Sequence, residues 1–341
     1  MNFLIIGAAA FILGLALVPL AMKAAFKWNV LDHPATHLKK HKKPMPYLGG
    51  VAIYLAFIIP VVASKMILHQ DIHGVIGILA GATILMLMGL VDDIKPLGPV
   101  VKLLVQLAVA AIMIRVQIHI RFMDNNIANW VLTVIWITGI TNALNLLDIM
   151  DGLAGGVTLV ASLAFFIVAV LAGRVNDMIP AVALFGSVAA FLIYNRPPAK
   201  IYMGDAGSLF LGFMLSALAL NESYSKVNVL AVLSPILILA VPIFDTTLVS
   251  VIRISKGMLP IYGSNDHVAQ RLVMLGLTRP QAVGVLVGAT ALLSGIAILS
   301  TFLSFNMTML LYLVTAFLTG MAAMLVGMVD MKDYHKKAVK S

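Results

Sequence analysis

The sequence contains no cysteine and few charged residues. Only 11% of its 341 residues are Asp, Glu, Lys or Arg. The lack of cysteine excludes disulfide bonds and thiolate metal sites. Soluble domains carry about a quarter charged residues, so the low charge also excludes an ordinary soluble domain. With 61% hydrophobic residues, the composition is that of an integral membrane protein.

Long apolar segments recur along the whole chain. Each is about long enough to cross some 30 Å of hydrocarbon as a helix. We identify eleven: residues 2–22, 48–64, 74–91, 100–114, 127–147, 153–173, 178–194, 206–220, 227–250, 281–303 and 307–329. The alternation of apolar and polar residues that is typical of membrane strands is absent. The predicted fold class is therefore all-α: a polytopic membrane helical bundle of about 11 transmembrane helices, forming a single domain over residues 1–341.

Basic residues are distributed unevenly between alternate loops. With the N-terminus outside, 18 of the 23 Lys and Arg residues fall on cytoplasmic loops or on the C-terminal tail. The external loops carry the other five: Lys65, Arg115, Arg121, Arg174 and Lys226. This imbalance follows the positive-inside rule, so we expect an external N-terminus and a cytoplasmic C-terminus. Topology and contact with anionic membrane lipid account for the net charge of +9, and no motif indicates nucleic-acid binding.

Acidic residues are scarce, and their positions are informative. Seven of the fourteen fall at or just beyond the predicted cytoplasmic helix ends: Asp92, Asp93, Asp148, Asp151, Asp205, Asp245 and Asp266. An acid at mid-bilayer costs something like 3 kcal/mol, so helix ends tolerate acids that helix centres do not. A single acid at a helix end is ordinarily just solvated. Seven on one side, from five separate loops, indicate one water-facing acidic site.

Amide and carboxylate side chains recur at helical spacing in the segment NALNLLDIMDGLAGG, residues 142–156. Asn142, Asn145, Asp148 and Asp151 follow one another at i+3 intervals, which would make them neighbours on a helix surface. Their oxygen atoms are the hard ligands that Mg²⁺ prefers. This segment therefore predicts a divalent metal site.

A second segment, NRPPAKIYMGDAGSLFLG at residues 195–212, places Asp205 between glycines just before an apolar span. Gly204, Gly207 and Ser208 would expose backbone N–H groups at a helix N-terminus, where phosphate oxygens bind readily. Two cytoplasmic loops, residues 23–47 and 251–280, are basic and lie beside the acids in the predicted topology. Cations next to a carboxylate-bound metal fit a diphosphate substrate. A basic loop that serves only topology is the alternative for residues 251–280.

The motifs, taken together, resemble the polyprenyl-phosphate N-acetylhexosamine-1-phosphate transferases, members of glycosyltransferase family 4. Six segments carry the resemblance, in order: KKPMPYLGG (42–50), VDDIKPLG (91–98), NALNLLDIMDGLAGG (142–156), NRPPAKIYMGDAGSLFLG (195–212), VPIFDT (241–246) and DHVAQRL (266–272). The resemblance implies a bacterial inner-membrane enzyme with a cytoplasmic active site. It would transfer a sugar 1-phosphate from a UDP-N-acetylhexosamine, most simply UDP-N-acetylglucosamine, to undecaprenyl phosphate, releasing UMP. The implied cofactor is Mg²⁺, with Mn²⁺ as an alternative, and the implied assembly is a homodimer.

The resemblance also implies roles for individual residues. Asn145 and Asp205 correspond to the metal site. Asp92, Asp93 and Asp148 correspond to the catalytic acids, with the first two nearest the acceptor phosphate. Uridine would contact Asp151, Asn195 and Tyr202, where Tyr202 replaces a stacking phenylalanine. The diphosphate would contact Lys43, His267 and Arg271.

Some features leave alternatives open. The last cytoplasmic loop has His267 but no histidine triplet after a proline, which argues against a muramoyl-pentapeptide donor. Another UDP-N-acetylhexosamine stays an alternative, as do the polyprenyl chain length and a two-step aspartyl-phosphate route. An ion-coupled secondary transporter would need acids near the bilayer midplane, whereas here they lie at one edge. A scaffold without activity gives no reason for acids and amides at i+3 spacing.

Overall fold

The chain folds almost entirely into helices. The computed structural model describes residues 3–32, 44–67, 73–121, 123–221, 229–255, 257 and 266–331. Two compact units divide it, Met1–Glu222 and Ser223–Ser341.

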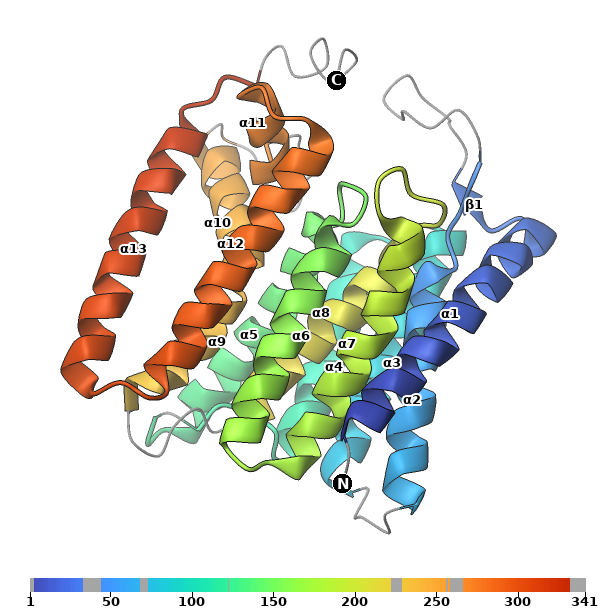
Figure 1. Cartoon of the computed structure of the whole chain (residues 1–341), viewed down its shortest axis with the longest axis horizontal. Helices are drawn as coiled ribbons and strands as arrows, with labels where there is room; N and C mark the ends of the chain where they lie inside the picture. Colours follow the sequence, from blue (N-terminus) through green and yellow to red (C-terminus); the bar gives the residue numbers. More distant parts are fainter. Residues whose placement is uncertain are drawn as a thin grey trace. The chain divides into compact units, whose positions relative to one another are not determined.

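Eight helices and a short hairpin form the first unit (Figure 1). The helices are α1 (Phe3–Trp28), α2 (Gly49–Ile67), α3 (His73–Ile94), α4 (Pro99–Arg115), α5 (Asn126–Leu147), α6 (Leu153–Leu171), α7 (Val175–Asn195) and α8 (Gly204–Asn221). Strands β1 (Leu31–Asp32) and β2 (Met45–Pro46) pair antiparallel between α1 and α2. Successive helices run in opposite directions. The last turns of α1, α3, α5 and α7 therefore meet the first turns of α2, α4, α6 and α8 at one end of the unit.

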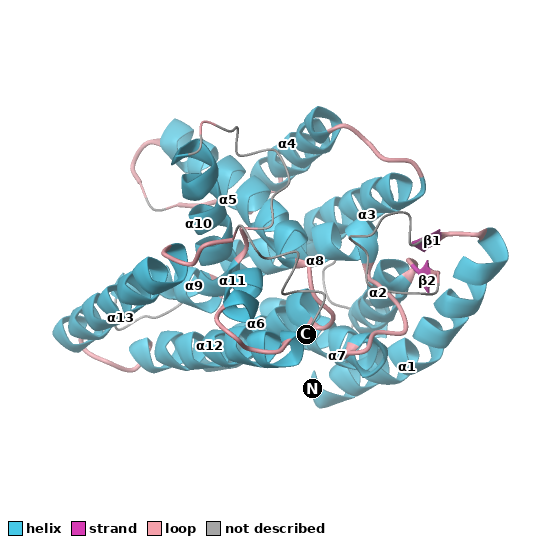
Figure 2. Cartoon of the chain, turned by 90° about the horizontal axis from the view of Figure 1, so that it is seen from above, coloured by secondary structure: helices cyan, strands magenta, loops and turns pink. Residues whose placement is uncertain are grey.

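Helix α8 is the centre of the first unit (Figure 2). It packs against α2, α3, α5, α6 and α7, and every residue from 206 to 219 is buried. A helix that is apolar on all sides belongs in such a position. Close approach to α2 requires glycine, because a Cβ on Gly50 would lie 2.1 Å from the backbone nitrogen of Gly207. The N-terminus of α8 is thereby held at the end where the predicted acids gather.

The second unit begins with a 3₁₀ helix, η1 (Val229–Leu233). It continues with α9 (Ser234–Ile238), α10 (Ala240–Ser255), α11 (Val268–Met274), α12 (Arg279–Ser300) and α13 (Phe305–Gly327). The axis bends by 71° between Leu230–Ile238 and Ala240–Ser255. Helix α12 starts with a capping box, in which the side chains of Thr278 and Gln281 each bond the other residue's backbone N–H.

The described residues include eight helices long and apolar enough to cross a membrane, and the bent pair in the second unit is a ninth candidate. The prediction of a helical polytopic membrane protein is therefore confirmed. The total of eleven spans is not confirmed. Predicted spans 100–114 and 206–220 form α4 and α8, which are short and place Lys102 and Asp205 in their first turns. The predicted orientation and the single domain stay predictions.

Candidate active site

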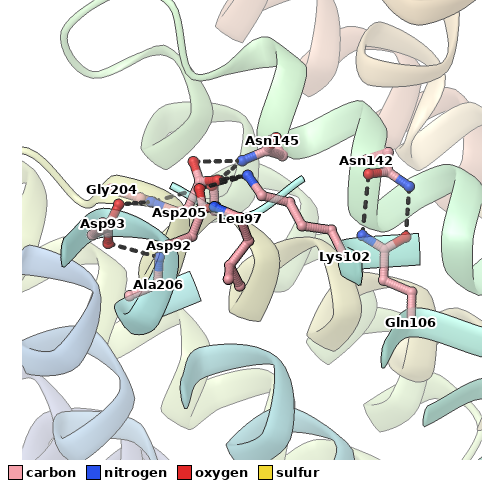
Figure 3. A network of polar contacts seen from close by, with 11 residues as sticks. Asp92, Asp93, Leu97, Lys102, Gln106, Asn142, Asn145, Gly204, Asp205 and Ala206 are labelled. Carbon is pink, nitrogen blue, oxygen red and sulfur yellow. Dashed lines mark hydrogen bonds and ion pairs between the residues drawn. The ribbon is translucent and has the colours of Figure 1, made fainter. Parts of the chain in front are cut away.

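Charged and amide side chains from four helices meet at the end of the first unit described above (Figure 3). Asp92 comes from the last turn of α3, Lys102 from the first turn of α4, Asn145 from the last turn of α5 and Asp205 from the first turn of α8. The ammonium nitrogen Nζ of Lys102 lies 2.6 Å from Oδ2 of Asp92 and 2.5 Å from Oδ2 of Asp205. The amide of Asn145 donates to Oδ1 of Asp205 over 3.0 Å. Two predicted metal ligands are thus in direct contact, and Asp92 joins them through a shared cation.

Lys102 is a site residue that the sequence analysis missed, because it was counted only among the cytoplasmic positive charges. A usable signal was present: Lys102 is the only charged residue of segment 100–114, and Gln106, one helical turn later, is its only other polar residue. A lone lysine in an apolar helix needs a partner. The sequence does not show that two carboxylates supply it.

The adjacent acids Asp92 and Asp93 have different roles. Both oxygens of Asp93 accept backbone N–H groups at the start of α8, from Asp205 over 2.7 Å and from Ala206 over 3.0 Å. A carboxylate is favourable at a helix N-terminus, where it satisfies free donors and opposes the helix dipole. Gly204 makes room for it: φ is +66°, and a Cβ there would lie 2.4 Å from Oδ2 of Asp93.

This cap changes one interpretation of the sequence. The N–H groups of Gly204, Gly207 and Ser208 at the start of α8 were expected to bind phosphate. The N–H of Gly207 instead bonds the carbonyl of Met203, and Asp93 accepts the neighbouring N–H groups of Asp205 and Ala206. The segment predicts a helix N-terminus correctly, whereas its ligand here is a carboxylate of the same chain. Asp92 and Asp205 are left as the acids that pair with the Lys102 ammonium.

The amides and acids predicted to be neighbours on one helix surface are only partly arranged in that way. Helix α5 ends at Leu147, so Asp148 is its C-cap and Asp151 lies in the following turn. Asn142 does not face Asp205. It exchanges two hydrogen bonds with Gln106, Nδ2 to Oε1 over 2.7 Å and Nε2 to Oδ1 over 3.1 Å. This amide pair fixes α4 to α5 one turn below Lys102 and Asn145, and it appears beside them in Figure 3.

Asp148, in the turn after α5, is an acid at this end of the first unit whose carboxyl titrates near neutral pH. Partial burial and the neighbouring charges of Asp205, Asp93 and Asp151 raise the pKa of its carboxyl to about 7. Within the described part of the chain, no hydrogen bond or ion pair holds this carboxylate. A group with these properties is a candidate to accept a proton at physiological pH.

The predicted uridine-binding residues join two loops. Asn195 accepts the N–H of Gly152 over 2.9 Å and donates to the carbonyl of Ile201 over 2.8 Å. Asp151 accepts the N–H of Ala199 over 2.9 Å. The turn between α5 and α6 is thereby tied to the connection between α7 and α8. Asn195 is buried and shapes the loop that carries Tyr202.

Tyr202 pairs with a second tyrosine, Tyr47, which precedes α2. Their ring centroids are 5.9 Å apart and the rings are tilted by 50°. The pKa of the Tyr47 phenol is raised by burial and by four carboxylates, those of Asp32, Asp93, Asp148 and Asp205. Tyr47 is therefore neutral and lies within electrostatic reach of the acid cluster. Lys43 lies outside the described residues.

His267 and Arg271 belong to the second unit, at the start of α11. Nδ1 of His267 lies 2.7 Å from Oδ2 of Asp245, whose Oδ1 accepts the N–H of Val268 over 2.7 Å. Arg271 contacts Asp266, with Nη2 3.0 Å from Oδ1. Its Nη1 donates to the carbonyl groups of Val326 and Gly327 in the last turn of α13 and to that of Val329 just beyond it. Both side chains are buried, and the predicted contact of each with a diphosphate stays a prediction.

Known proteins resemble this chain over most of its length. Residues 75–222 match the model of glycosyl transferase family 4. A Bacillus subtilis (strain 168) protein named "Probable undecaprenyl-phosphate N-acetylglucosaminyl 1-phosphate transferase" is 34% identical over 308 residues, 85% of each chain. The chain belongs to glycosyl transferase family 4.

Two further relatives are less similar to this chain. A Yersinia pestis protein named undecaprenyl-phosphate alpha-N-acetylglucosaminyl 1-phosphate transferase is 26% identical, over 86% of this chain and 83% of its own. A Mycolicibacterium smegmatis protein named decaprenyl-phosphate N-acetylglucosaminephosphotransferase is 29% identical, over 71% and 68%. The family match runs from α3 to α8, so it contains the whole Asp92–Lys102–Asp205 cluster.

The carboxylates of Asp92 and Asp205 fit a Mg²⁺ ion whose other ligands are substrate phosphates and water. Among the described residues, no three His, Asp or Glu side chains converge as a ready-made metal site. Mg²⁺ is commonly held by one or two carboxylates together with substrate phosphates and water. Asp92 and Asp205 meet that requirement, since one oxygen of each already faces a single cation, the Lys102 ammonium.

Proposed function

We propose that this family 4 chain transfers N-acetylglucosamine 1-phosphate from UDP-N-acetylglucosamine to undecaprenyl phosphate and releases UMP. The observation that carries the proposal is the cluster of Asp92, Lys102, Asn145 and Asp205 at one end of a membrane helix bundle. The names of the relatives support the sugar, because all three refer to N-acetylglucosamine. They also support a polyprenyl phosphate acceptor, with undecaprenyl in two names and decaprenyl in the third.

The location of the cluster suits a reaction between a water-soluble donor and a lipid acceptor. Helix ends lie where the hydrocarbon core meets the aqueous phase, so the phosphates of both substrates can reach the cluster there. The excess of Lys and Arg on the loops at this end supports a cytoplasmic site in the inner membrane. A homodimer is a further prediction of the resemblance.

The chain's own residues account for binding and proton transfer. Asp92, Asp205 and Asn145 would hold Mg²⁺, which when bound neutralises phosphoryl charge and improves UMP as a leaving group, with Mn²⁺ as an alternative. Asp148 accepts the remaining proton of the lipid phosphate, or orients that phosphate. An acceptor oxygen then attacks the β-phosphorus of the donor as the bond to the UMP oxygen breaks. Tyr202 beside Tyr47 supplies an aromatic surface for uracil, while Asp93 holds the backbone of Asp205 in place.

The test is UMP release by purified protein with undecaprenyl phosphate, Mg²⁺ and a panel of UDP-sugars. We expect release with UDP-N-acetylglucosamine, and release at least about a hundredfold slower in a matched Asp205→Asn variant. Release with only the muramoyl-pentapeptide donor would replace the donor and keep the reaction. Release of one equivalent of UMP without acceptor would indicate the aspartyl-phosphate route. No release with any donor or metal would refute the transferase function.

A further inference from the structure

Lys102 occupies the point where two carboxylates of the site converge. Its ammonium nitrogen is within 2.6 Å of an oxygen of Asp92 and 2.5 Å of an oxygen of Asp205. The two carboxylates have a formal charge of −2 and the ammonium of Lys102 adds +1, so the formal net charge of these three side chains is −1. The side chains are 12–27% exposed, so water reaches all three.

The other oxygen of each carboxylate is held by a neutral donor. Oδ1 of Asp92 accepts the N–H of Leu97 over 2.6 Å, and Oδ1 of Asp205 accepts the amide of Asn145 over 3.0 Å. The backbone beneath is fixed as well, because the Gln106–Asn142 pair joins α4 to α5. The two converging oxygens are therefore positioned independently of Lys102, whereas the ammonium sits at the end of a flexible four-carbon chain.

We propose that Lys102 is the resident counter-ion of the metal site, and that a divalent cation displaces its ammonium from between Asp92 and Asp205. The inference rests on the proposed function for the identity of the cation. Mg²⁺ requires oxygen ligands at about 2.0–2.1 Å, so ammonium and metal cannot share the point that both oxygens face. When the divalent cation replaces the ammonium, the formal charges of Asp92, Asp205 and the metal ion sum to zero. The displaced Lys102 ammonium then becomes available to another ligand of the site, and only when metal is bound.

Lys102→Met tests the exchange, because methionine is similar in length and neutral. In detergent, without donor or acceptor, we expect Mn²⁺ to bind the variant roughly ten- to a hundredfold more tightly, as followed by the spectroscopic signal of free Mn²⁺. Lys102→Arg keeps the charge and should bind Mn²⁺ much as the unchanged protein does. Lys95→Met is the matched control, since Lys95 is an exposed lysine of the same α3–α4 connection. Equal or weaker Mn²⁺ binding by Lys102→Met would overturn the proposal.

A second measurement uses only the unchanged protein, so it can be made even if Lys102→Met does not fold. The unchanged protein is treated briefly with an amine-reactive reagent, with and without Mg²⁺, and labelling at each lysine is read by mass spectrometry. Release of the ammonium predicts at least about a threefold rise at Lys102 with Mg²⁺ and little change at Lys95, because a charge-paired amine reacts slowly. Labelling of Lys102 that is unchanged or reduced by Mg²⁺ would contradict displacement.

The two proposals fail in distinguishable ways. Neither metal binding nor lysine labelling requires a sugar donor or a lipid acceptor. A chain that exchanges Lys102 for metal but releases no UMP would refute the transferase function alone. A chain that releases UMP while Mg²⁺ leaves Lys102 labelling unchanged would refute the exchange alone.

Discussion

The ion pairs of the two units differ in how completely their charges are matched. In the second unit, Asp266 faces Arg271 and Asp245 faces His267, with side chains 1–7% exposed, and the charge of Arg253 interacts with both carboxylates. In the first unit, one ammonium serves two carboxylates, and the three side chains are 12–27% exposed. Buried, matched pairs resist exchange because separating them leaves a charge in a low dielectric. The group around Lys102 has two carboxylates for one ammonium and is more exposed to water, so it is the group that can accept another cation.

Asp205→Asn should have the largest effect. The substitution keeps the size of the side chain and removes one of the two charges that converge on Lys102. We expect UMP release to fall by at least about a hundredfold, as when a group that stabilises transition-state charge is lost. A melting temperature close to that of the unchanged protein, measured in detergent, is the control. Activity within a few fold of the unchanged protein would refute a role for Asp205 in the reaction.

Arg271→Ala should act on stability. Removal of the guanidinium leaves Asp266 buried without this partner and the carbonyls at the end of α13 without their donor. Breaking a buried pair of this kind costs about 3–5 kcal/mol. We expect a clear fall in melting temperature and in folded yield. A variant that melts normally yet has a raised KM for the UDP-sugar would instead support the predicted contact of Arg271 with the diphosphate.

Asp93→Ala should have a moderate effect, because it removes the cap of α8. Loss of such a cap costs about 1 kcal/mol. Asn has a single acceptor oxygen, so it can accept only one of the two N–H groups that Asp93 accepts. Thermal melting should therefore rank the unchanged protein first, Asp93→Asn next and Asp93→Ala last. If Asp93→Asn abolished UMP release without changing the melting temperature, Asp93 would have a chemical role beyond capping.

Asp148→Asn should change stability in a way that depends on pH. The pKa of Asp148 is raised in the folded protein to about 7. The folded state therefore binds this proton more tightly than the unfolded state, and ionisation of Asp148 costs stability as pH rises from about 4 to about 7. We expect the variant to melt above the unchanged protein at pH 8 and to lose that advantage near pH 4. A difference that is constant over this range would mean that Asp148 is not buried among like charges.

The motifs indicated which residues gather near one another, and the contacts that they did not indicate depend on helix ends and helix rotation. The resemblance to family 4 paired Asn145 with Asp205, and in the structure the amide nitrogen of Asn145 lies 3.0 Å from Oδ1 of Asp205. Asp148 and Asp151 were placed on the helix of Asn145, but α5 stops at Leu147 and the chain turns away. Lys102 was missed because its importance comes from two acids, 10 and 103 residues away in the chain, that no local pattern connects to it.

By itself, the sequence determined that this is a helical membrane protein with acids at one edge and the motifs of family 4. These are properties of composition, run length and motif order, which need no knowledge of contacts. Only the tertiary structure decided that Asp93 caps α8 while Asp92 meets Lys102. Neighbours on a helix point about 100° apart, so which of two adjacent acids faces which partner depends on how α3 is rotated against α4 and α8.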